Sequence, residues 1–203
     1  MLLGAMMEDY TMEDRAKLYA EAFPKYPDSH LTSSKTTDRI YGMWFGGQNY
    51  KSKAKFYGTY PANYLKRVES LFPDAKNVLH LFAGAVEPGN YTRFDLHPDR
   101  CDVHGDAEKL STYFGDEAFD LIYADPPYSQ ADQEKYIPGQ KMVNRKQVLH
   151  ECYKVLKPGG YIVWLDQVLP MYRKEEFALA GSIGFVRSTN HRFRVVTIFR
   201  KQV

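Results

Sequence analysis

The chain has 203 residues, 44% hydrophobic and 26% charged, which suits one well-buried domain and leaves too little length for two. No uncharged stretch approaches the roughly 20 residues of a membrane-spanning helix, and the apolar start at residues 1–7 lacks the basic lead of a signal peptide. The two cysteines, Cys101 and Cys152, are isolated and give no metal-ligand spacing. We therefore expect a cytoplasmic protein with no bound metal and no membrane association.

The net charge of +2 hides an uneven distribution along the chain. Residues 61–129 carry 6 basic and 12 acidic side chains, hence −6, whereas residues 130–203 carry 13 basic and 6 acidic, hence +7. An acidic centre beside a basic last third suits a protein that holds a cationic ligand and approaches a polyanion. A solvated basic face is the alternative interpretation.

The first 57 residues are predicted to form a helix and an irregular arm, ahead of a main domain at 58–203. Apolar spacing predicts an amphipathic helix over 12–23, ended by Pro24. From there to about residue 58 the chain is rich in Ser, Thr, Gly, Tyr and Pro without periodicity, which favours an irregular segment. Helical spacing returns over 64–72.

The main domain then alternates between strands and helices. Strands are expected at 78–82, 91–96, 101–103, 119–124, 161–165, 183–186 and 193–199, and helices at 108–113, 143–156 and 175–180. This order predicts an α/β, Rossmann-like single domain: a mostly parallel sheet with a C-terminal antiparallel hairpin and helices on both faces. Ligands of such sheets bind beyond the carboxyl ends of the strands, so the turns after the first, second and fourth strands are the candidate site.

The most specific feature is Asp125-Pro126-Pro127-Tyr128, directly after the apolar strand at 119–124. Two prolines fix the backbone and leave rigid carbonyls that accept hydrogen bonds. A carboxylate beside them can bind both hydrogens of an exocyclic NH2 group and orient its lone pair, while the tyrosine offers a stacking face. A Pro-Pro turn with Asp125 as a simple cap is the structural alternative.

This segment resembles the signature of the amino-group DNA methyltransferases, which modify adenine N6 or cytosine N4. The wider resemblance, over about residues 55–200, is to class I S-adenosylmethionine-dependent methyltransferases, and residues 148–160 are similar to the helix and turn before the fifth strand of that superfamily. It implies a methyltransferase fold, S-adenosylmethionine as cofactor and Asp125, Pro126, Pro127 and Tyr128 as catalytic residues.

The resemblance also places the first cofactor motif at residues 78–84. Gly84 would let the backbone approach the cofactor closely, with Phe82 and Ala83 beside it. The sequence departs from the family in two ways. His80 stands where an acidic residue is usual, and only residues 85–90 separate this motif from the next strand, where a helix is expected. The pocket is therefore either open on that side or covered by another element.

Two further carboxylates extend the implied cofactor site. Asp95, at the end of the second strand, corresponds to the residue that holds the ribose hydroxyls, and a carboxylate suits two donors. Asp106 corresponds to the residue that contacts the adenine amino group, and it is equally a candidate N-cap of the helix at 108–113. Upstream, Tyr60 and Pro61 belong to a loose match of the segment that closes over the cofactor.

Two segments are candidates for nucleic-acid contact. Asn190, His191, Arg192 and Arg194 lie in a basic turn of the C-terminal hairpin. The aromatic residues Trp44, Phe45 and Tyr50 alternate with Lys51, Lys53 and Lys55, as in proteins that bind single strands. A solvated loop is the alternative in both cases.

Together these features predict methyl transfer to an amino group of a nucleic-acid base, with adenine N6 of DNA as the first choice because the signature begins with Asp. RNA or another amino-group substrate on the same fold is one alternative. A binding or regulatory module that has lost the cofactor is another. About 200 residues leave no room for a separate recognition domain, so a homodimer or a specificity partner is expected.

Overall fold

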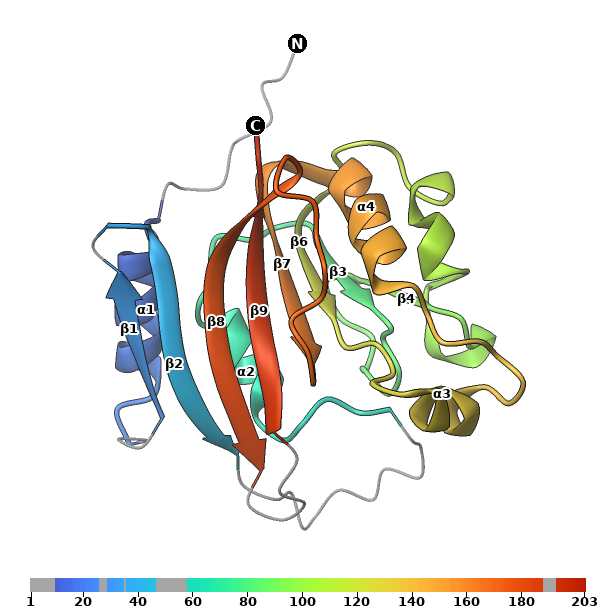
Figure 1. Ribbon diagram of the computed structural model, residues 1–203, viewed down its shortest axis with the longest axis horizontal. Coiled ribbons are helices and arrows are strands. Elements are labelled where there is room, and N and C mark those ends of the chain that lie inside the picture. The colour runs from blue at the N-terminus through green and yellow to red at the C-terminus, as the bar shows by residue number, and fades with distance from the viewer. Residues whose placement is uncertain (1–9, 26–28, 35, 47–57, 188–192) are drawn as a thin grey trace.

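The computed structural model describes residues 10–25, 29–34, 36–46, 58–187 and 193–203, and nothing is said here of the structure of the rest. Its strands form one sheet in the order β1-β2-β8-β9-β7-β6-β3-β4-β5 (Figure 1). The strands are β1 His30–Ser34, β2 Arg39–Gly46, β3 Val78–Leu81, β4 Thr92–Asp95, β5 Val103–His104, β6 Phe119–Ala124, β7 Leu156–Asp166, β8 Phe177–Arg187 and β9 Phe193–Lys201. The helices are α1 Met12–Ala22, α2 Tyr64–Glu69, α3 Gln130–Tyr136 and α4 Arg145–Val155, with 3-10 helices η1 Pro98–Arg100 and η2 Ala107–Thr112.

The strands from β5 to β8 confirm the predicted α/β class. The pairs β4–β5, β3–β4, β3–β6 and β6–β7 are parallel, and β9 is antiparallel to both β7 and β8. The C-terminal hairpin predicted from the sequence is therefore present. Parallel strands need crossover connections, and the connections through η2 and α4 supply them.

Helices cover both faces of the sheet, and successive residues of the buried strands point to opposite sides. Leu121 and Tyr123 of β6 pack with α1 and α2, whereas Ile122 and Ala124 pack with α4 and η2. All six residues of β6 are buried, which explains why its sequence is an apolar run without alternation.

The expectation of an irregular arm before residue 58 was wrong for residues 30–46. β1 and β2 form an antiparallel hairpin, and β2 pairs in parallel with β8, so the sheet extends beyond β8. Ile40 and Trp44 of β2 are fully buried against α1. The segment lacks clear periodicity because its strand conformation depends on β8, more than 130 residues away in the chain.

The helix expected at 175–180 was also wrong. Residues 177–187 form β8, which lies between β2 and β9. Glu175, Glu176, Ala178 and Ala180 favour a helix locally, but hydrogen bonding to two neighbouring strands outweighs this preference. The connection after β7 therefore contains no helix among its residues 167–176, all of which are described.

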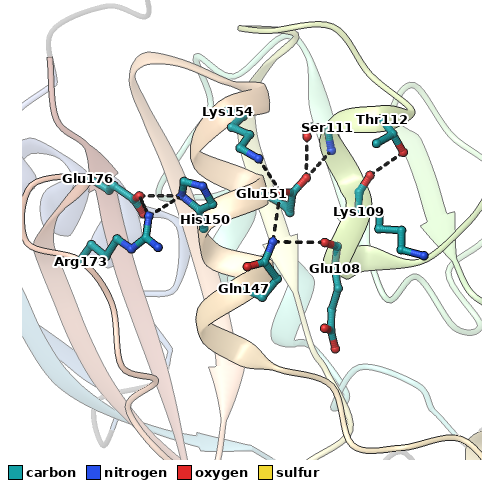
Figure 2. A network of polar contacts seen from close by, with 10 residues as sticks. All are labelled: Glu108, Lys109, Ser111, Thr112, Gln147, His150, Glu151, Lys154, Arg173 and Glu176. Carbon is teal, nitrogen blue, oxygen red and sulfur yellow. Dashed lines mark hydrogen bonds and ion pairs between the residues drawn. The ribbon is translucent and has the colours of Figure 1, made fainter.

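A buried carboxylate ties η2 to α4 (Figure 2). Glu151 Oε2 accepts from the Ser111 backbone N–H at 2.9 Å and the Ser111 hydroxyl at 2.6 Å, and Oε1 accepts from Lys154 Nζ at 2.6 Å. Gln147 extends the network to the Glu108 carbonyl at 3.4 Å. Glu108 lines the candidate site, so this network helps to position one of its walls.

Replacing Glu151 by Ala is expected to lower the free energy of unfolding by about 2–3 kcal/mol, because it leaves the Ser111 donors without their acceptor. Burial alone would raise the pKa of Glu151, but hydrogen bonds from Lys154 and Ser111 outweigh it and lower the pKa. The loss should therefore be full at neutral pH and shrink in acid, as the carboxylate takes up a proton. Urea unfolding at pH 7 and pH 4 measures it. Glu13→Ala, in an exposed pair with Lys17, is the control and should change stability by less than about 0.5 kcal/mol; an equal effect of both substitutions would contradict the prediction.

Candidate active site

A cavity of about 480 Å³ lies beyond the carboxyl ends of β3, β4 and β6. This is the edge at which an open parallel sheet binds its ligands. Of the residues predicted from the sequence, the cavity is lined by Tyr60, Pro61, Phe82, Ala83, Asp95, Asp106, Asp125, Pro126, Pro127, Tyr128 and Arg194. Residues from six separate segments, spread over 134 positions of the chain, thus meet at one place.

The turn after β3 is held in an unusual backbone conformation. Phe82 has φ 60° and Gly84 has φ 55°, a region that favours glycine and is strained for phenylalanine. A Cβ at Gly84 would lie 2.1 Å from the carbonyl oxygen of Gly58, so only glycine fits beneath that strand of backbone. Strain at this point is typical of a turn shaped for a ligand.

The segment 58–61 closes the side that the short β3–β4 connection leaves open. Residues 82–91 contain no helix, as the sequence predicted. The Ala85 N–H donates to the Gly58 carbonyl at 3.2 Å, and the adjoining Tyr60 and Pro61 line the cavity. Another element therefore covers the pocket, which was one of the two alternatives.

Asp95, at the end of β4, is buried and accepts three hydrogen bonds. Oδ1 accepts from the His97 N–H at 2.8 Å, and Oδ2 accepts from the Gly84 N–H at 2.9 Å and from the Tyr136 hydroxyl at 2.8 Å. The carboxylate thus joins the turn after β3 to the turn after β4. Tyr136, at the end of α3, was not foreseen because it lies 41 residues away in the sequence.

The Tyr136 hydroxyl occupies the donor position that a ligand hydroxyl would need on Asp95. Replacing Tyr136 by Phe is therefore expected to tighten S-adenosylmethionine binding by about tenfold, since one charge-assisted hydrogen bond no longer competes. Isothermal titration calorimetry measures the dissociation constant. Tyr91→Phe is the control, because its hydroxyl donates to the Glu87 carbonyl outside this cavity. Weaker binding by Tyr136→Phe would show that the hydroxyl contacts the ligand instead of competing with it.

Asp106 lines the cavity and also caps η2. Its Oδ1 accepts from the Glu108 N–H at 2.9 Å, which is the N-cap interaction anticipated from the sequence. A Cβ at the preceding Gly105 would meet the rings of Tyr113 and Phe94 at 2.5 and 2.7 Å, so the chain passes tightly between them. The second oxygen of Asp106 has no partner among the hydrogen bonds of the described residues.

His80 lies outside the cavity lining, contrary to its predicted position at the cofactor. Its ring is 1% exposed and packs among Tyr91, Tyr123 and Tyr60, with centroids 4.4, 5.1 and 6.0 Å away. Burial lowers the pKa of His80 to about 4, so the ring is neutral at physiological pH. In this structure it fills the core where the resemblance expects an acidic side chain.

The Asp125-Pro126-Pro127-Tyr128 segment follows β6 at the centre of this edge. The Tyr128 hydroxyl donates to Asp125 Oδ1 at 2.6 Å, and Arg194 Nε donates to the Tyr128 oxygen at 3.1 Å. Burial raises the pKa of Asp125 to about 7, against the hydrogen bond from Tyr128 and the charge of Arg194. A carboxyl group with this pKa accepts and releases protons near neutral pH.

A second layer of charged residues holds the catalytic segment from behind. Arg145 donates to the Tyr128 carbonyl at 3.1 Å and, through Nε, to Asp166 Oδ2 at 2.6 Å. Trp164 Nε1 donates to the same oxygen of Asp166 at 3.2 Å. Asp166 is fully buried at the end of β7. Sequence reasoning missed this group, because nothing in the local pattern joins α4 to the turn after β6.

The basic turn proposed for nucleic-acid contact is placed only in part. Asn190, His191 and Arg192 lie outside the described residues. Arg194 is 6% exposed, and its guanidinium carbon lies 5.3 Å from the centre of the Tyr128 ring. It is therefore a buried partner of the catalytic segment and not a surface cation available to phosphate.

The charge of the cavity suits a cationic ligand. Its lining holds the acidic residues Asp95, Asp106, Glu108, Asp125 and Asp132, and the basic residues Lys135, Lys141 and Arg194. Apolar walls come from Phe82, Phe94, Ala107 and Val143. Carboxylates at the strand ends and an apolar slot between them fit a ligand with hydroxyl groups, an aromatic ring and a positive charge.

Comparison with known proteins gives this arrangement its family. Residues 75–164 match the family model described as "Methyltransferase domain". That segment is a class I methyltransferase domain. The match spans β3 to most of β7 and includes the turns that carry Asp95, Asp106 and Asp125. S-adenosylmethionine is the cofactor of this domain, and the cavity fits it through the carboxylates and apolar walls described above.

Individual relatives are distant from this methyltransferase domain and its flanks. The ribosomal RNA small subunit methyltransferase B of Shewanella oneidensis is 27% identical over 88 residues, covering 37% of this chain. The TrmN structure from Thermus thermophilus is 18% identical over 62% of this chain, with a TM-score of 0.44. The N-methyltransferase NodS from Bradyrhizobium japonicum, in complex with S-adenosylhomocysteine, is 13% identical over 63% of this chain, with a TM-score of 0.41. The chain spans 21%, 44% and 78% of these proteins respectively.

No helix among the described residues is long and apolar enough to cross a membrane.

Proposed function

We propose that this protein transfers a methyl group from S-adenosylmethionine to an exocyclic amino nitrogen of a nucleic-acid base. The observation that carries the proposal is the shared cavity. Asp125 and Tyr128 line the same space as Asp95 and Asp106, so an acceptor held by the first pair lies beside a cofactor held by the second. This placement supplies proximity and orientation, the main requirement of a direct transfer.

The catalytic segment orients the acceptor. Asp125 and the Pro126 carbonyl accept the two hydrogens of the amino group, which directs the nitrogen lone pair toward the cofactor side of the cavity. Tyr128 releases its hydrogen bond to Asp125 and stacks its ring on the base. The cofactor, when bound, supplies the electrophilic methyl group.

Asp125 also completes the proton balance. The nitrogen forms a bond to the methyl carbon while the carbon–sulfur bond breaks with its electrons going to sulfur. The methylated nitrogen then carries one surplus proton. The Asp125 carboxylate, whose pKa is raised to about 7 by burial, can accept that proton and pass it to water. Arg194 and Tyr128 hold this carboxylate in its ionised form before transfer.

Adenine N6 of DNA is the first candidate target, because the signature of this chain begins with Asp. That preference comes from the resemblance to amino-group DNA methyltransferases. RNA is the second candidate, and the match to a protein named as a ribosomal RNA methyltransferase favours it over the part that aligns. A cofactor-free binding module is the remaining alternative.

The discriminating experiment compares initial rates of transfer of a tritiated methyl group to four acceptors of one sequence. These are single-stranded DNA, duplex DNA, single-stranded RNA and a strand in which every adenine is replaced by purine without its amino group. We expect transfer to a DNA strand and none to the purine strand. Transfer to RNA alone would replace the DNA target by RNA. Absence of transfer to every acceptor, with the cofactor bound, would contradict the proposal.

A further inference from the structure

One face of the sheet beyond β9 is left without a helix. Figure 1 shows the broad faces of β2 and β8 with no helix in front of them among the described residues, whereas α1 lies behind β2. The connection 167–176 contains no helix to cover this face. The exposed face therefore belongs to the strands on the hairpin side of the sheet.

Three aromatic side chains project from this face. Tyr41 is 40% exposed, Phe45 50% and Phe193 50%. The strand register puts them on one side, because Phe45 pairs with Val186 and Val186 pairs with Phe193, while Tyr41 lies four residues before Phe45 on β2. We call Tyr41, Phe45 and Phe193 the aromatic platform. Strand spacing puts Phe45 and Phe193 about 10 Å apart, and Tyr41 about 13 Å from Phe45.

Small residues keep the surface between the rings flat. Gly184 lies on the same face, and a Cβ there would come within 2.7 Å of Met43 Sδ and 3.0 Å of Phe193 Cζ. The side chains of Met43 and Phe193 thus lie across the glycine instead of standing away from the sheet. A flat aromatic surface is suited to stacking against planar groups.

The platform is continuous with the catalytic segment. Val195, two residues after Phe193 and on the same face, pairs with Asp166 of β7. Asp166 holds Arg145, which donates to the carbonyl of Tyr128. One strand therefore separates the platform from the residues that support the acceptor. Phe45 and Phe193 also lie at the carboxyl-end edge of β8, where the cavity opens.

The charge around the platform favours a polyanion. The residues of this face, namely Tyr41, Met43, Phe45, Ser182, Gly184, Val186, Phe193 and Val195, include no acidic side chain. The sequence that follows β2, residues 47–57, contains three lysines and no acidic residue, and residues 188–192 contain one arginine, one histidine and no acidic residue. A second copy of this chain would bring the same positive charge toward itself, whereas a nucleic acid complements it.

We propose that the aromatic platform binds the nucleotides that flank the target base, in a single-stranded nucleic acid, by stacking them on Phe45, Phe193 and Tyr41. The inference rests on the proposed function, because it supplies the surface along which that substrate lies. Base stacking on exposed aromatic rings tolerates any sequence, which suits a chain with no separate recognition domain.

The test is fluorescence anisotropy of a labelled 20-nucleotide single strand, in DNA and RNA versions, with the full chain. Phe45→Leu and Phe193→Leu should each weaken binding by about tenfold, since leucine keeps the apolar area but removes the ring. Phe45→Trp should bind at least as tightly as the wild type. S-adenosylmethionine affinity, measured by calorimetry, should stay unchanged in all three variants and shows that they are folded.

A methyl-transfer comparison separates the platform from the catalytic site. With a trinucleotide acceptor, Phe45→Leu should match the wild type, whereas with the 20-mer its KM should rise about tenfold while kcat stays the same. Equal binding of the 20-mer by Phe45→Leu, or no binding by the wild type, would overturn the inference. So would a concentration-dependent dimer that Phe45→Asp disrupts and the nucleic acid does not. Binding that depends on the rings without any methyl transfer would leave the platform standing and contradict only the proposed function.

Discussion

Replacing Asp125 by Asn is expected to reduce methyl transfer by about 10²–10³-fold while leaving S-adenosylmethionine affinity within about twofold. Asparagine keeps the shape and one acceptor oxygen, but it loses the charge that receives the surplus proton. The hydrogen bond from Tyr128 at 2.6 Å can persist, so the local structure is retained. Single-turnover rates with saturating cofactor measure the effect. Asp116→Asn, at an exposed aspartate, is the matched control and should transfer at the wild-type rate.

The pH dependence of transfer gives an independent check on Asp125. Its pKa is raised to about 7 by burial, and only the ionised carboxylate accepts both the amino hydrogen and the proton. The transfer rate should therefore rise about tenfold per pH unit below 7 and level off above it. The profile of Asp125→Asn should be flat over this range. A wild-type profile that is flat between pH 5.5 and 7 would remove Asp125 from the proton transfer.

The same shift predicts that Asp125→Asn stabilises the fold in base. A carboxyl group with a raised pKa in the folded state favours the protonated form, so the wild type loses stability as the pH rises from about 4 to about 7. A shift from 3.8 to about 7 corresponds to at most about 4 kcal/mol. Thermal melting at pH 8 should show a higher Tm for the variant, and the difference should vanish near pH 4. A lower Tm at pH 8 would show that Asp125 stabilises the fold through its partners instead.

Replacing Asp95 by Asn is the second large effect expected, a loss of about 30–100-fold in S-adenosylmethionine affinity. The wild type should bind in the micromolar range, near −8 kcal/mol. Asp95 is 1% exposed and bonds the N–H groups of Gly84 and His97, so it both shapes the pocket and offers the acceptors for the cofactor hydroxyls. Calorimetry measures the dissociation constant. Asp99→Asn, on the exposed 3-10 helix that follows, is the control and should bind as the wild type does.

Two results would contradict the role of Asp95. One is unchanged cofactor affinity in the folded Asp95→Asn variant. The other is a loss that Asp99→Asn shares, since it would come from the acidic field of the region and not from a direct contact. A fall in Tm without a change in affinity would make Asp95 a purely structural link between the turns after β3 and β4.

The central strands were predictable because their local pattern and their environment agree. β6 matches its predicted bounds at both ends, and its apolar run follows from burial on both faces. β1, β2 and β8 were missed or mistaken for the opposite reason. Each is stabilised by a partner distant in sequence, and the local preferences of residues 24–58 and 175–180 indicate other structures.

The candidate site shows the same division. The turns after β3, β4 and β6 could be located from short motifs, since each carries its own glycine, carboxylate or proline signal. Tyr136, Arg145 and Asp166 could not, because their roles arise from contacts that span 41, 17 and 21 residues. His80 occupies a motif position, yet the packing of three tyrosines around its ring decides its environment.

The position of the transferred methyl group tests the central claim most directly. The wild type is incubated with methyl-labelled S-adenosylmethionine and a DNA strand that contains one adenine, and the strand is digested to nucleosides for mass spectrometry. The account predicts a single labelled product, the nucleoside methylated on its exocyclic amino nitrogen, and no product with Asp125→Asn. Label on a ring carbon, a ring nitrogen or a sugar hydroxyl would contradict the account, because Asp125 and the Pro126 carbonyl would then have no amino hydrogens to bind.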